Sequence, residues 1–297
     1  MNVMHLGGHT EGMTSPGQAS GTVTLGGDLT VNRLGYGAMQ LTGQGIWGPP
    51  ADRDECIRVL RRAVELGVNF IDTADSYGPY VSEELIAEAL HPYADDVVIG
   101  TKAGLLRCGP GDWRPLGKPD YLRQEVEMSL RRLKLERIDL FQLHRFDPEV
   151  PVEDSLGELK ALQDEGKIRH IGISETSVEQ VKQARAIVDV VSVQNMFNLS
   201  DRGHEDVLDY CTNEGIAFIP WFPLATGKLT GEGSPLTEAA KRHDVSPAQL
   251  ALAWVLHRSP QVLAIPGTSK VAHLEDNMKA ALVELSDTEF KELENAV

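Results

Sequence analysis

Four residues whose side chains can carry or exchange a proton each follow an apolar stretch of the chain. Asp72 and Tyr77 lie five residues apart in the segment FIDTADSYGP, residues 70–79. Lys102 comes directly after the run VVIGT, and His144 comes directly after LFQL. Taken singly, Asp72 could cap a turn and His144 could be a buried structural imidazole. Taken together, the four residues predict a shared site.

This combination of acid, phenol, amine and imidazole suits the transfer of a proton to a carbonyl oxygen. A free Tyr has a pKa of about 10, but a neighbouring ammonium favours the phenolate and eases proton donation near neutral pH. Lys102 would supply that ammonium, Asp72 would hold Lys102 in place, and His144 would donate to or orient the substrate oxygen. The sequence shows no cysteine pair, metal-ligand cluster or nucleophile elbow, so an external reductant is expected to supply the electrons.

Short apolar strands alternate with amphipathic helices along most of the chain, and this alternation would bring the four residues together. Eight strands are predicted, the first within 33–40 and the others at 69–72, 97–101, 138–143, 170–173, 191–194, 217–220 and 262–265. Helices are predicted at 52–66, 82–90, 120–134, 153–165, 177–186, 203–214 and 246–258. Nearly continuous apolar strands between helices indicate a parallel sheet that is covered on both faces.

Eight such units without a break in composition favour an α/β fold of the closed (β/α)8 type, the TIM barrel. A Gly-Gly turn within residues 22–31 predicts a β-hairpin before the barrel, and a helical extension is expected at the C-terminus. An open Rossmann sheet is the weaker alternative, because Gly35 and Gly37 lack the third glycine of its dinucleotide-binding motif. We therefore expect a flexible tail over residues 1–20 and a single barrel domain over residues 21–297.

In a barrel of this type the carboxyl ends of the strands line the mouth of the active site. Asp72, Tyr77, Lys102 and His144 all fall at or just after such ends. Three further polar or aromatic residues do so as well, namely Ser174, Gln194 and Trp221. The predicted fold thus directs the candidate chemical groups to the same rim.

Charge and cysteine content narrow the classes of partner. The 297 residues include 28 Lys and Arg against 44 Asp and Glu, a formal net charge of −16, which disfavours nucleic acid and anionic membranes as partners. The three cysteines are widely spaced and form no CxxC motif, so neither a disulfide framework nor a metal site is expected. The sequence shows neither a secretory leader nor an apolar run of membrane-spanning length, and a cytoplasmic protein is expected.

The four residues stand in sequence contexts that resemble those of the aldo-keto reductase superfamily. These contexts are FIDTADSYG, VVIGTKAG, IDLFQLHRFDP and KIRHIGIS, in the order of the family, and the resemblance extends over residues 22–295. NRLGYGAMQLTGQGIWGPP and IPGTSKVAHLEDN are most similar to the bacterial branch that includes pyridoxal reductases. The resemblance implies an NAD(P)H-dependent oxidoreductase that interconverts an aldehyde or ketone and its alcohol by hydride transfer. Tyr77 would be its general acid and base.

The resemblance also implies a nicotinamide cofactor that lies extended over the mouth of the barrel. Ser174 and Gln194 would hold its carboxamide, and Trp221 would stack on the nicotinamide where the family usually has Tyr. The remaining residues match the pyrophosphate loop and the adenosine segment. The implied cofactor-binding set is Gly37, Ala38, Met39, Asp72, Ser174, Gln194, Trp221, Pro223, Leu224, Gly227, Lys228, Gly267, Thr268, Ser269, Lys270, His273, Asp276 and Asn277.

Three departures from the family pattern bear on the cofactor. Gly267 and His273 stand where many relatives have Lys and Arg, which are main partners of the 2′-phosphate. NADP(H) remains the expected cofactor, and these departures make NAD(H) the alternative. Glu175 replaces the Asn that often follows the Ser, which weakens the amide contact expected there.

The loops around the mouth contribute an apolar and aromatic set for substrate binding, namely Met39, Trp47, Tyr80, Trp113, Phe146 and Phe197. These residues predict a small neutral carbonyl compound or alcohol, with a ring as one candidate shape, rather than a phosphorylated sugar. A monomer or a small homo-oligomer is expected. Two other functions are weaker alternatives: a non-catalytic nicotinamide-binding regulatory subunit of the same fold, and a non-redox barrel lyase. The intact set of four residues favours the reductase over both.

Overall fold

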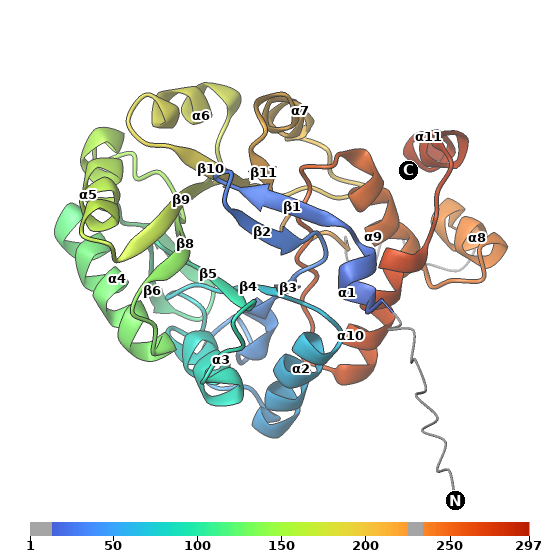
Figure 1. The fold of residues 1–297 in the computed structure, drawn as a ribbon, viewed down its shortest axis with the longest axis horizontal. Helices are drawn as coiled ribbons and strands as arrows, with labels where there is room; N and C mark the ends of the chain where they lie inside the picture. Colours follow the sequence, from blue (N-terminus) through green and yellow to red (C-terminus); the bar gives the residue numbers. More distant parts are fainter. Residues whose placement is uncertain (1–13, 225–233, 297) are drawn as a thin grey trace, which may run out of the picture.

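The computed structural model describes residues 14–224 and 234–296. Parallel strands form a ring at the centre of the molecule, and helices surround them (Figure 1). Seven strands are hydrogen-bonded in the order β11-β10-β9-β8-β5-β4-β3. Their bounds are β3 (Tyr36–Gly37), β4 (Phe70–Asp72), β5 (Val98–Ala103), β8 (Ile138–Leu143), β9 (Ile168–Ser174), β10 (Val190–Gln194) and β11 (Ala217–Phe218).

The eighth segment of the ring is residues 262–265, which join its two edges by single bridges rather than as a regular strand. Val262 pairs with Phe218 of β11, and Ala264 pairs with Leu34 just before β3. The amide of Gly35 donates to the Ala264 carbonyl at 2.8 Å, and the amide of Leu263 donates to the Phe218 carbonyl at 2.9 Å. The sheet is therefore closed, and the prediction of a (β/α)8 barrel is confirmed.

The helices cover the outside of the ring, and capping boxes stabilise the start of two of them. Ser177 begins one helix and Ser246 another, and each forms a capping box with a Gln three residues later. The helices along the barrel are α2 (Arg53–Glu65), α3 (Val81–Leu90), α4 (Pro119–Leu133), α5 (Val152–Asp164), α6 (Val178–Arg185), α7 (Glu205–Glu214) and α9 (Pro247–Arg258).

Further helices extend the C-terminal part, as expected. They are α8 (Pro235–Arg242), α10 (Val271–Met278), the short 3-10 helix η2 (Lys279–Leu282) and α11 (Asp287–Ala296). Figure 1 shows α8 and α11 outside the ring of barrel helices. None of the helices in the described part of the chain combines the length and apolar character that a membrane span requires.

A hairpin of β1 (Thr22–Leu25) and β2 (Leu29–Asn32) crosses the middle of the ring in Figure 1 and covers one end of the barrel. Its Val23, Leu25, Leu29 and Val31 are buried in one cluster with residues of the barrel strands, including Phe70. The turn contains Gly26 and Gly27 with φ of +59° and +80°, a region that favours glycine. The predicted hairpin is thus present.

Two parts of the fold differ from the expectations. Helix α1 (Pro16–Ala19) lies within the stretch expected to be a flexible tail, and the amide of Gly17 donates to the Leu66 carbonyl at 2.9 Å. The capping box of Ser15 and Gln18 accounts for this short helix. A second hairpin, β6 (Leu105–Gly109) and β7 (Asp112–Pro115), follows β5 and was not expected from the sequence.

Candidate active site

Asp72, Tyr77, Lys102 and His144 meet at the carboxyl end of the barrel strands, as predicted. Lys102 Nζ donates to Asp72 Oδ2 at 2.7 Å and to Tyr77 OH at 3.2 Å. A third bond from Nζ goes to the Thr73 carbonyl at 2.8 Å. The rings of Tyr77 and His144 meet edge to face, with centroids 5.9 Å apart. The register explains the meeting, because β4 pairs with β5 and β5 pairs with β8.

Burial and charge set the protonation states of the site. Burial raises the pKa of the Tyr77 phenol, and the Lys102 ammonium offsets part of that rise. Burial alone would lower the pKa of Lys102, but the Asp72 carboxylate and Tyr77 together outweigh burial, and this pKa lies above its ordinary value. Burial, together with the cations Lys102 and Arg145, lowers the pKa of His144 well below its ordinary value. The site therefore holds a phenol, an ammonium and a neutral imidazole at neutral pH.

Further side chains contact Asp72 and His144. Gln194 Nε2 donates to Asp72 Oδ1 at 2.9 Å, and Gln142 Nε2 lies 3.3 Å from the same oxygen. Ser76 Oγ lies 3.3 Å from His144 Nδ1. When the Ser76 hydroxyl donates to Nδ1, the proton of the neutral ring is on Nε2, which can then donate to a substrate oxygen.

A cavity of about 1020 Å³ opens over these residues, and many of the predicted cofactor-binding residues line it. Ser174, Gln194 and Trp221 line it beside Asp72 and Tyr77. Its lining also includes other members of the predicted set, namely Gly37, Met39, Pro223, Leu224, Gly267, Thr268, His273, Asp276 and Asn277. Ala38, Ser269 and Lys270 are close in sequence to this lining but are not part of it. Gly227 and Lys228 lie outside the described residues.

Glu175 contacts Trp221, and this contact was not foreseen. The indole Nε1 of Trp221 donates to Glu175 Oε1 at 2.5 Å, and the amide of Met196 donates to the same oxygen at 2.8 Å. Glu175 adopts a left-handed backbone conformation with φ of +54°. The residue that departs from the family pattern thus fixes the indole that also departs from it.

The far end of the cavity lies at the N-terminus of α10. The amide of Val271, the first residue of this helix, donates to Glu55 Oε1 at 3.0 Å. A Cβ atom at Gly267 would lie 2.7 Å from the Gly37 carbonyl oxygen, so the backbone leaves no room there for the Lys of many relatives. A carboxylate at the helix start and the missing Lys both weaken this end as a site for a 2′-phosphate.

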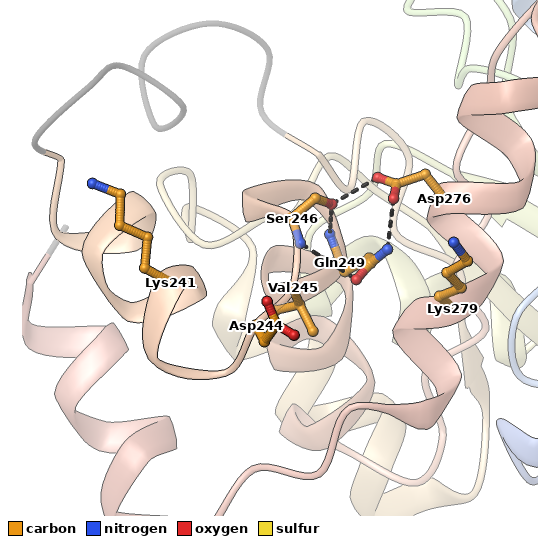
Figure 2. A pocket seen from close by; sticks show the side chains of 7 residues that line it. All are labelled: Lys241, Asp244, Val245, Ser246, Gln249, Asp276 and Lys279. Carbon is orange, nitrogen blue, oxygen red and sulfur yellow. Dashed lines mark hydrogen bonds between the residues drawn. The ribbon is translucent and has the colours of Figure 1, made fainter.

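The carboxylate of Asp276 is bound to protein groups, although the residue lines the cavity. Figure 2 shows its carboxylate turned toward α9, where it accepts from Ser246 Oγ at 2.7 Å and from Gln249 Nε2 at 2.6 Å. These residues line a smaller polar pocket of about 460 Å³ together with Lys241 and Lys279. Asp276 therefore ties α10 to α9, and both of its oxygens already accept hydrogen bonds from protein.

Only part of the predicted substrate set lines the cavity. Met39 and Trp113 do so, and the Arg107 guanidinium lies 3.6 Å from the Trp113 ring centroid and 5.6 Å from that of Trp47. Trp47 is not among the residues that line the cavity, and its backbone pairs with Gly78.

Three predicted substrate residues are corrected by the structure. Phe197 has no exposed surface and stacks on Trp254 with ring centroids 5.9 Å apart, so it is a core residue. Tyr80 lies before α3, under the Arg132 guanidinium at 4.1 Å, and outside the cavity. Phe146 is partly buried and packs against the core. An aromatic residue after a strand can face the core or the mouth, and the sequence does not distinguish the two.

Several residues of the site were missed by the sequence reasoning. Arg107 donates to the carbonyls of Ser76, Ile46 and Gly45 at 2.8 to 2.9 Å and so joins β6 to the loops around the cavity. Arg145, directly after His144, lines the cavity. The position of Arg145 at a strand end could have identified it as a site residue. Arg107 could not be identified in this way, because these three carbonyls lie 31 to 62 positions away along the chain.

The residues present fit an extended nicotinamide cofactor. The cavity runs from the chemical groups around Tyr77 to the start of α10, with Ser174 and Gln194 as polar groups and Trp221 as an aromatic surface at one end. A nicotinamide cofactor supplies or accepts a hydride at such a site. The four central residues can transfer a proton to or from an oxygen on the same carbon.

Comparisons with known proteins agree with this geometry. The profile of the Aldo/keto reductase family matches residues 33–297. An uncharacterized oxidoreductase of Schizosaccharomyces pombe is 55% identical over 275 residues, 93% of this chain and 89% of the relative. The pyridoxine 4-dehydrogenase of Escherichia coli is 45% identical over 275 residues, 91% of this chain and 96% of the relative.

Solved structures give the same assignment. A glycerol dehydrogenase from Gluconobacter oxydans superimposes with a TM-score of 0.84 at 29% identity, over 94% of this chain and 95% of the other. An aldo-keto reductase from Klebsiella pneumoniae in complex with NADPH superimposes with a TM-score of 0.80 at 27% identity, over 92% and 94%. This chain belongs to the aldo/keto reductase family, whose members are oxidoreductases that use a nicotinamide cofactor.

Proposed function

We propose that this protein interconverts a small aldehyde or ketone and the corresponding alcohol, with NADP(H) as cofactor and Tyr77 as general acid and base. The observation that carries the proposal is the position of Lys102 Nζ, which donates to both Tyr77 OH and Asp72 Oδ2. In the reductive direction the Tyr77 phenol would protonate the oxygen that becomes the alcohol. Neutral His144 would donate a hydrogen bond to the same oxygen and stabilise its developing negative charge.

The proposed roles of the remaining cofactor residues follow from their places in the cavity. Ser174 and Gln194 would bind the carboxamide, and Trp221, held by Glu175, would support the nicotinamide ring. Thr268 and Asn277 would bind the adenosine end. Glu55 accepts a hydrogen bond from the N-terminus of α10, and its carboxylate disfavours a 2′-phosphate there. We therefore expect a smaller preference for NADPH over NADH than in relatives that have Lys in place of Gly267.

The substrate class rests on the lining and on a relative. Met39, Ile46, Leu105 and Trp113 give one wall of the cavity an apolar and aromatic character, which suits a ring-shaped carbonyl compound. The pyridoxine 4-dehydrogenase of E. coli, 45% identical, is named for a ring-bearing alcohol. Pyridoxal and pyridoxine are therefore the first substrates that we propose for this protein.

A nucleotide titration followed by a carbonyl panel tests this function. The purified protein is titrated with NADPH and with NADH through protein fluorescence. Pyridoxal, benzaldehyde and a phosphorylated sugar aldehyde are then offered, and oxidation of the nicotinamide is followed by absorbance. We expect both nucleotides to bind, NADPH more tightly, and the two ring aldehydes to be reduced. Binding without turnover of any carbonyl would support a regulatory subunit instead, and the absence of binding would contradict both roles.

The three described cysteines are free, and Cys56 and Cys211 are buried. Free cysteines suit a reducing compartment, so we propose a cytoplasmic location. We also propose that residues 21–297 fold as one barrel domain and that the protein is a monomer or a small homo-oligomer.

A further inference from the structure

We propose that Arg145 binds a hydroxyl or phenolate oxygen that the substrate carries on the ring position next to its reacting carbonyl group. The substrates would be aromatic aldehydes with an ortho hydroxyl group and the corresponding alcohols. This inference rests on the proposed function and names the part of the substrate that this site distinguishes.

Arg145 is held beside the reacting groups. It follows His144 at the end of β8, and its side chain lines the same cavity as Tyr77 and His144. Its Nη1 donates to the His144 carbonyl at 2.6 Å and lies 3.2 Å from Ser174 Oγ. The guanidinium is therefore held between the ends of β8 and β9 before any substrate arrives.

The charge of Arg145 has no contacting partner among the described residues. A partly buried cation normally has an anionic partner, because removal from water is costly without one. Within the described residues, no carboxylate oxygen lies within 4.0 Å of the Arg145 guanidinium. Asp72 pairs with Lys102. The charge of Glu175 acts on Arg145 without contact, and Glu175 Oε1 accepts from Trp221 and Met196. Arg145 thus brings a positive charge to the cavity that these described acids do not neutralise by contact.

The Arg145 guanidinium also retains hydrogen-bond donors for a ligand. A guanidinium has five N–H groups in a planar fork, and it binds oxygen acceptors through adjacent nitrogens. The Nε and Nη2 atoms of Arg145 donate to no group in the described part of the protein, in contrast to Nη1. These two nitrogens form the fork that a substrate oxygen can accept from.

The position of Arg145 relative to Tyr77 and His144 determines where the substrate must carry that oxygen. A reacting carbonyl must lie within hydrogen-bond reach of Tyr77 OH and His144. Arg145 lines the same cavity as both groups, and its Nη1 donates to the carbonyl of His144 at 2.6 Å. An oxygen bound by Arg145 is therefore near the carbonyl rather than at the far end of the substrate. The presence of Trp113 in the lining favours an aromatic ring as the frame that joins the two oxygens.

Three matched substrates test the proposal. Benzaldehyde has no ring oxygen, 2-hydroxybenzaldehyde has one beside the carbonyl, and 4-hydroxybenzaldehyde has the same group at the opposite position. Each is reduced by the wild type and by Arg145→Met, with NADPH saturating. Arg145→Met is expected to lower kcat/KM for 2-hydroxybenzaldehyde about ten- to hundred-fold more than for the other two, the usual effect of a hydrogen bond to a charged group.

Two further variants keep the test decisive. Arg145→Lys retains the charge without the fork and should lose part of the ortho preference; it replaces Arg145→Met if that variant does not fold. Arg114→Met removes an exposed Arg on β7 that pairs with Asp112, and it should leave the ortho preference unchanged. The NADPH dissociation constant of Arg145→Met, measured by fluorescence, should equal that of the wild type.

An equal loss for all three aldehydes, or a weaker NADPH affinity in Arg145→Met, would overturn the proposal and place Arg145 on the cofactor or in the support of His144. Reduction of benzaldehyde by the wild type with no ortho effect of the variant overturns this inference alone. If the wild type binds NADPH and reduces none of the three aldehydes or pyridoxal, the proposed function fails as well.

Discussion

Lys102 donates through one ammonium to Asp72, Tyr77 and the Thr73 carbonyl, and its side chain has no exposed surface. All three of its protons are therefore used inside the protein. The charge of this ammonium is balanced by Asp72, and Tyr77 receives only part of its field. At the scale of single residues, the reactivity of the phenol depends on this one cation.

Asp72→Asn is expected to destabilise the fold as well as impair turnover. Removal of one partner from a buried ion pair leaves the other charge uncompensated and costs about 3–5 kcal/mol. The double variant Asp72→Asn/Lys102→Met removes both charges and should recover much of that stability without recovering activity. Urea unfolding of the wild type and the two variants measures this effect. Equal stability of the single and double variants would contradict the account of the pair.

At the scale of elements, the loop between β4 and α3 carries both Ser76 and Tyr77 and is held from two sides. The amide of Asp75 donates to the Lys102 carbonyl at 3.1 Å, and Arg107 of β6 donates to the Ser76 carbonyl at 2.9 Å. The Asp75 carboxyl is buried behind this loop, where Tyr121 of α4 donates to its Oδ2 at 3.2 Å. Its Oδ1 has no partner among the described residues.

Asp75 makes the stability of this loop depend on pH. Burial, with the nearby Glu125 and Glu83 carboxylates, raises the pKa of Asp75 well above its ordinary value. The folded state therefore binds a proton that the unfolded state releases, so stability falls as pH rises from the unfolded pKa through the folded pKa. Asp75→Asn cannot ionise and should gain stability relative to the wild type over that window.

Thermal unfolding of Asp75→Asn and wild type between pH 4 and pH 9 measures this difference. The exposed Asp120→Asn on the same helix as Tyr121 is the matched control and should show a constant offset from the wild type. A constant offset for Asp75→Asn as well would show that its carboxyl does not favour the protonated form.

At the scale of the whole molecule, the two ends of the barrel have separate tasks. The hairpin β1–β2 covers one end, and the cavity with Tyr77 opens at the carboxyl ends of the strands. Leu25 of the hairpin has no exposed surface and packs with Phe70, two residues before Asp72. Stability and chemistry therefore depend on opposite ends of the same strands.

Leu25→Ala is expected to lower the free energy of unfolding by about 2–5 kcal/mol through the cavity that it leaves. The values of kcat and KM should stay within twofold of wild type well below the melting temperature, because the change is at the closed end. Thr22→Ala, at an exposed position of the same strand, should change stability by less than about 0.5 kcal/mol. A loss of kcat in folded Leu25→Ala would contradict the separation of the two ends.

The alternation of strands and helices and the four central residues could be predicted from sequence, because each follows a nearly continuous apolar run at a strand end. Strand β8 was predicted with its observed bounds, Ile138–Leu143. Residues 262–265 were predicted as a strand, but they close the ring through single bridges. Their pairing depends on the two edges of the sheet, which only the folded chain brings together.

The positions of some residues could not be predicted, because they depend on contacts between parts of the chain that are distant in sequence. Phe197 and Trp113 are both aromatic residues that the sequence assigns to loops around the mouth, yet one is in the core and the other lines the cavity. The contact of Glu175 with Trp221 joins residues 46 positions apart. Local patterns carry no information about such pairs, whereas the apolar periodicity of a strand is local.

Tyr77 is the proton donor on which the proposed reaction depends, and the turnover of Tyr77→Phe tests this role. This variant retains the ring and removes only the hydroxyl that Lys102 contacts. With NADPH and pyridoxal saturating, we expect kcat to fall by at least about 10²- to 10⁴-fold, the usual contribution of general acid catalysis, while the NADPH dissociation constant stays at its wild-type value. A kcat within a few-fold of wild type would contradict the account.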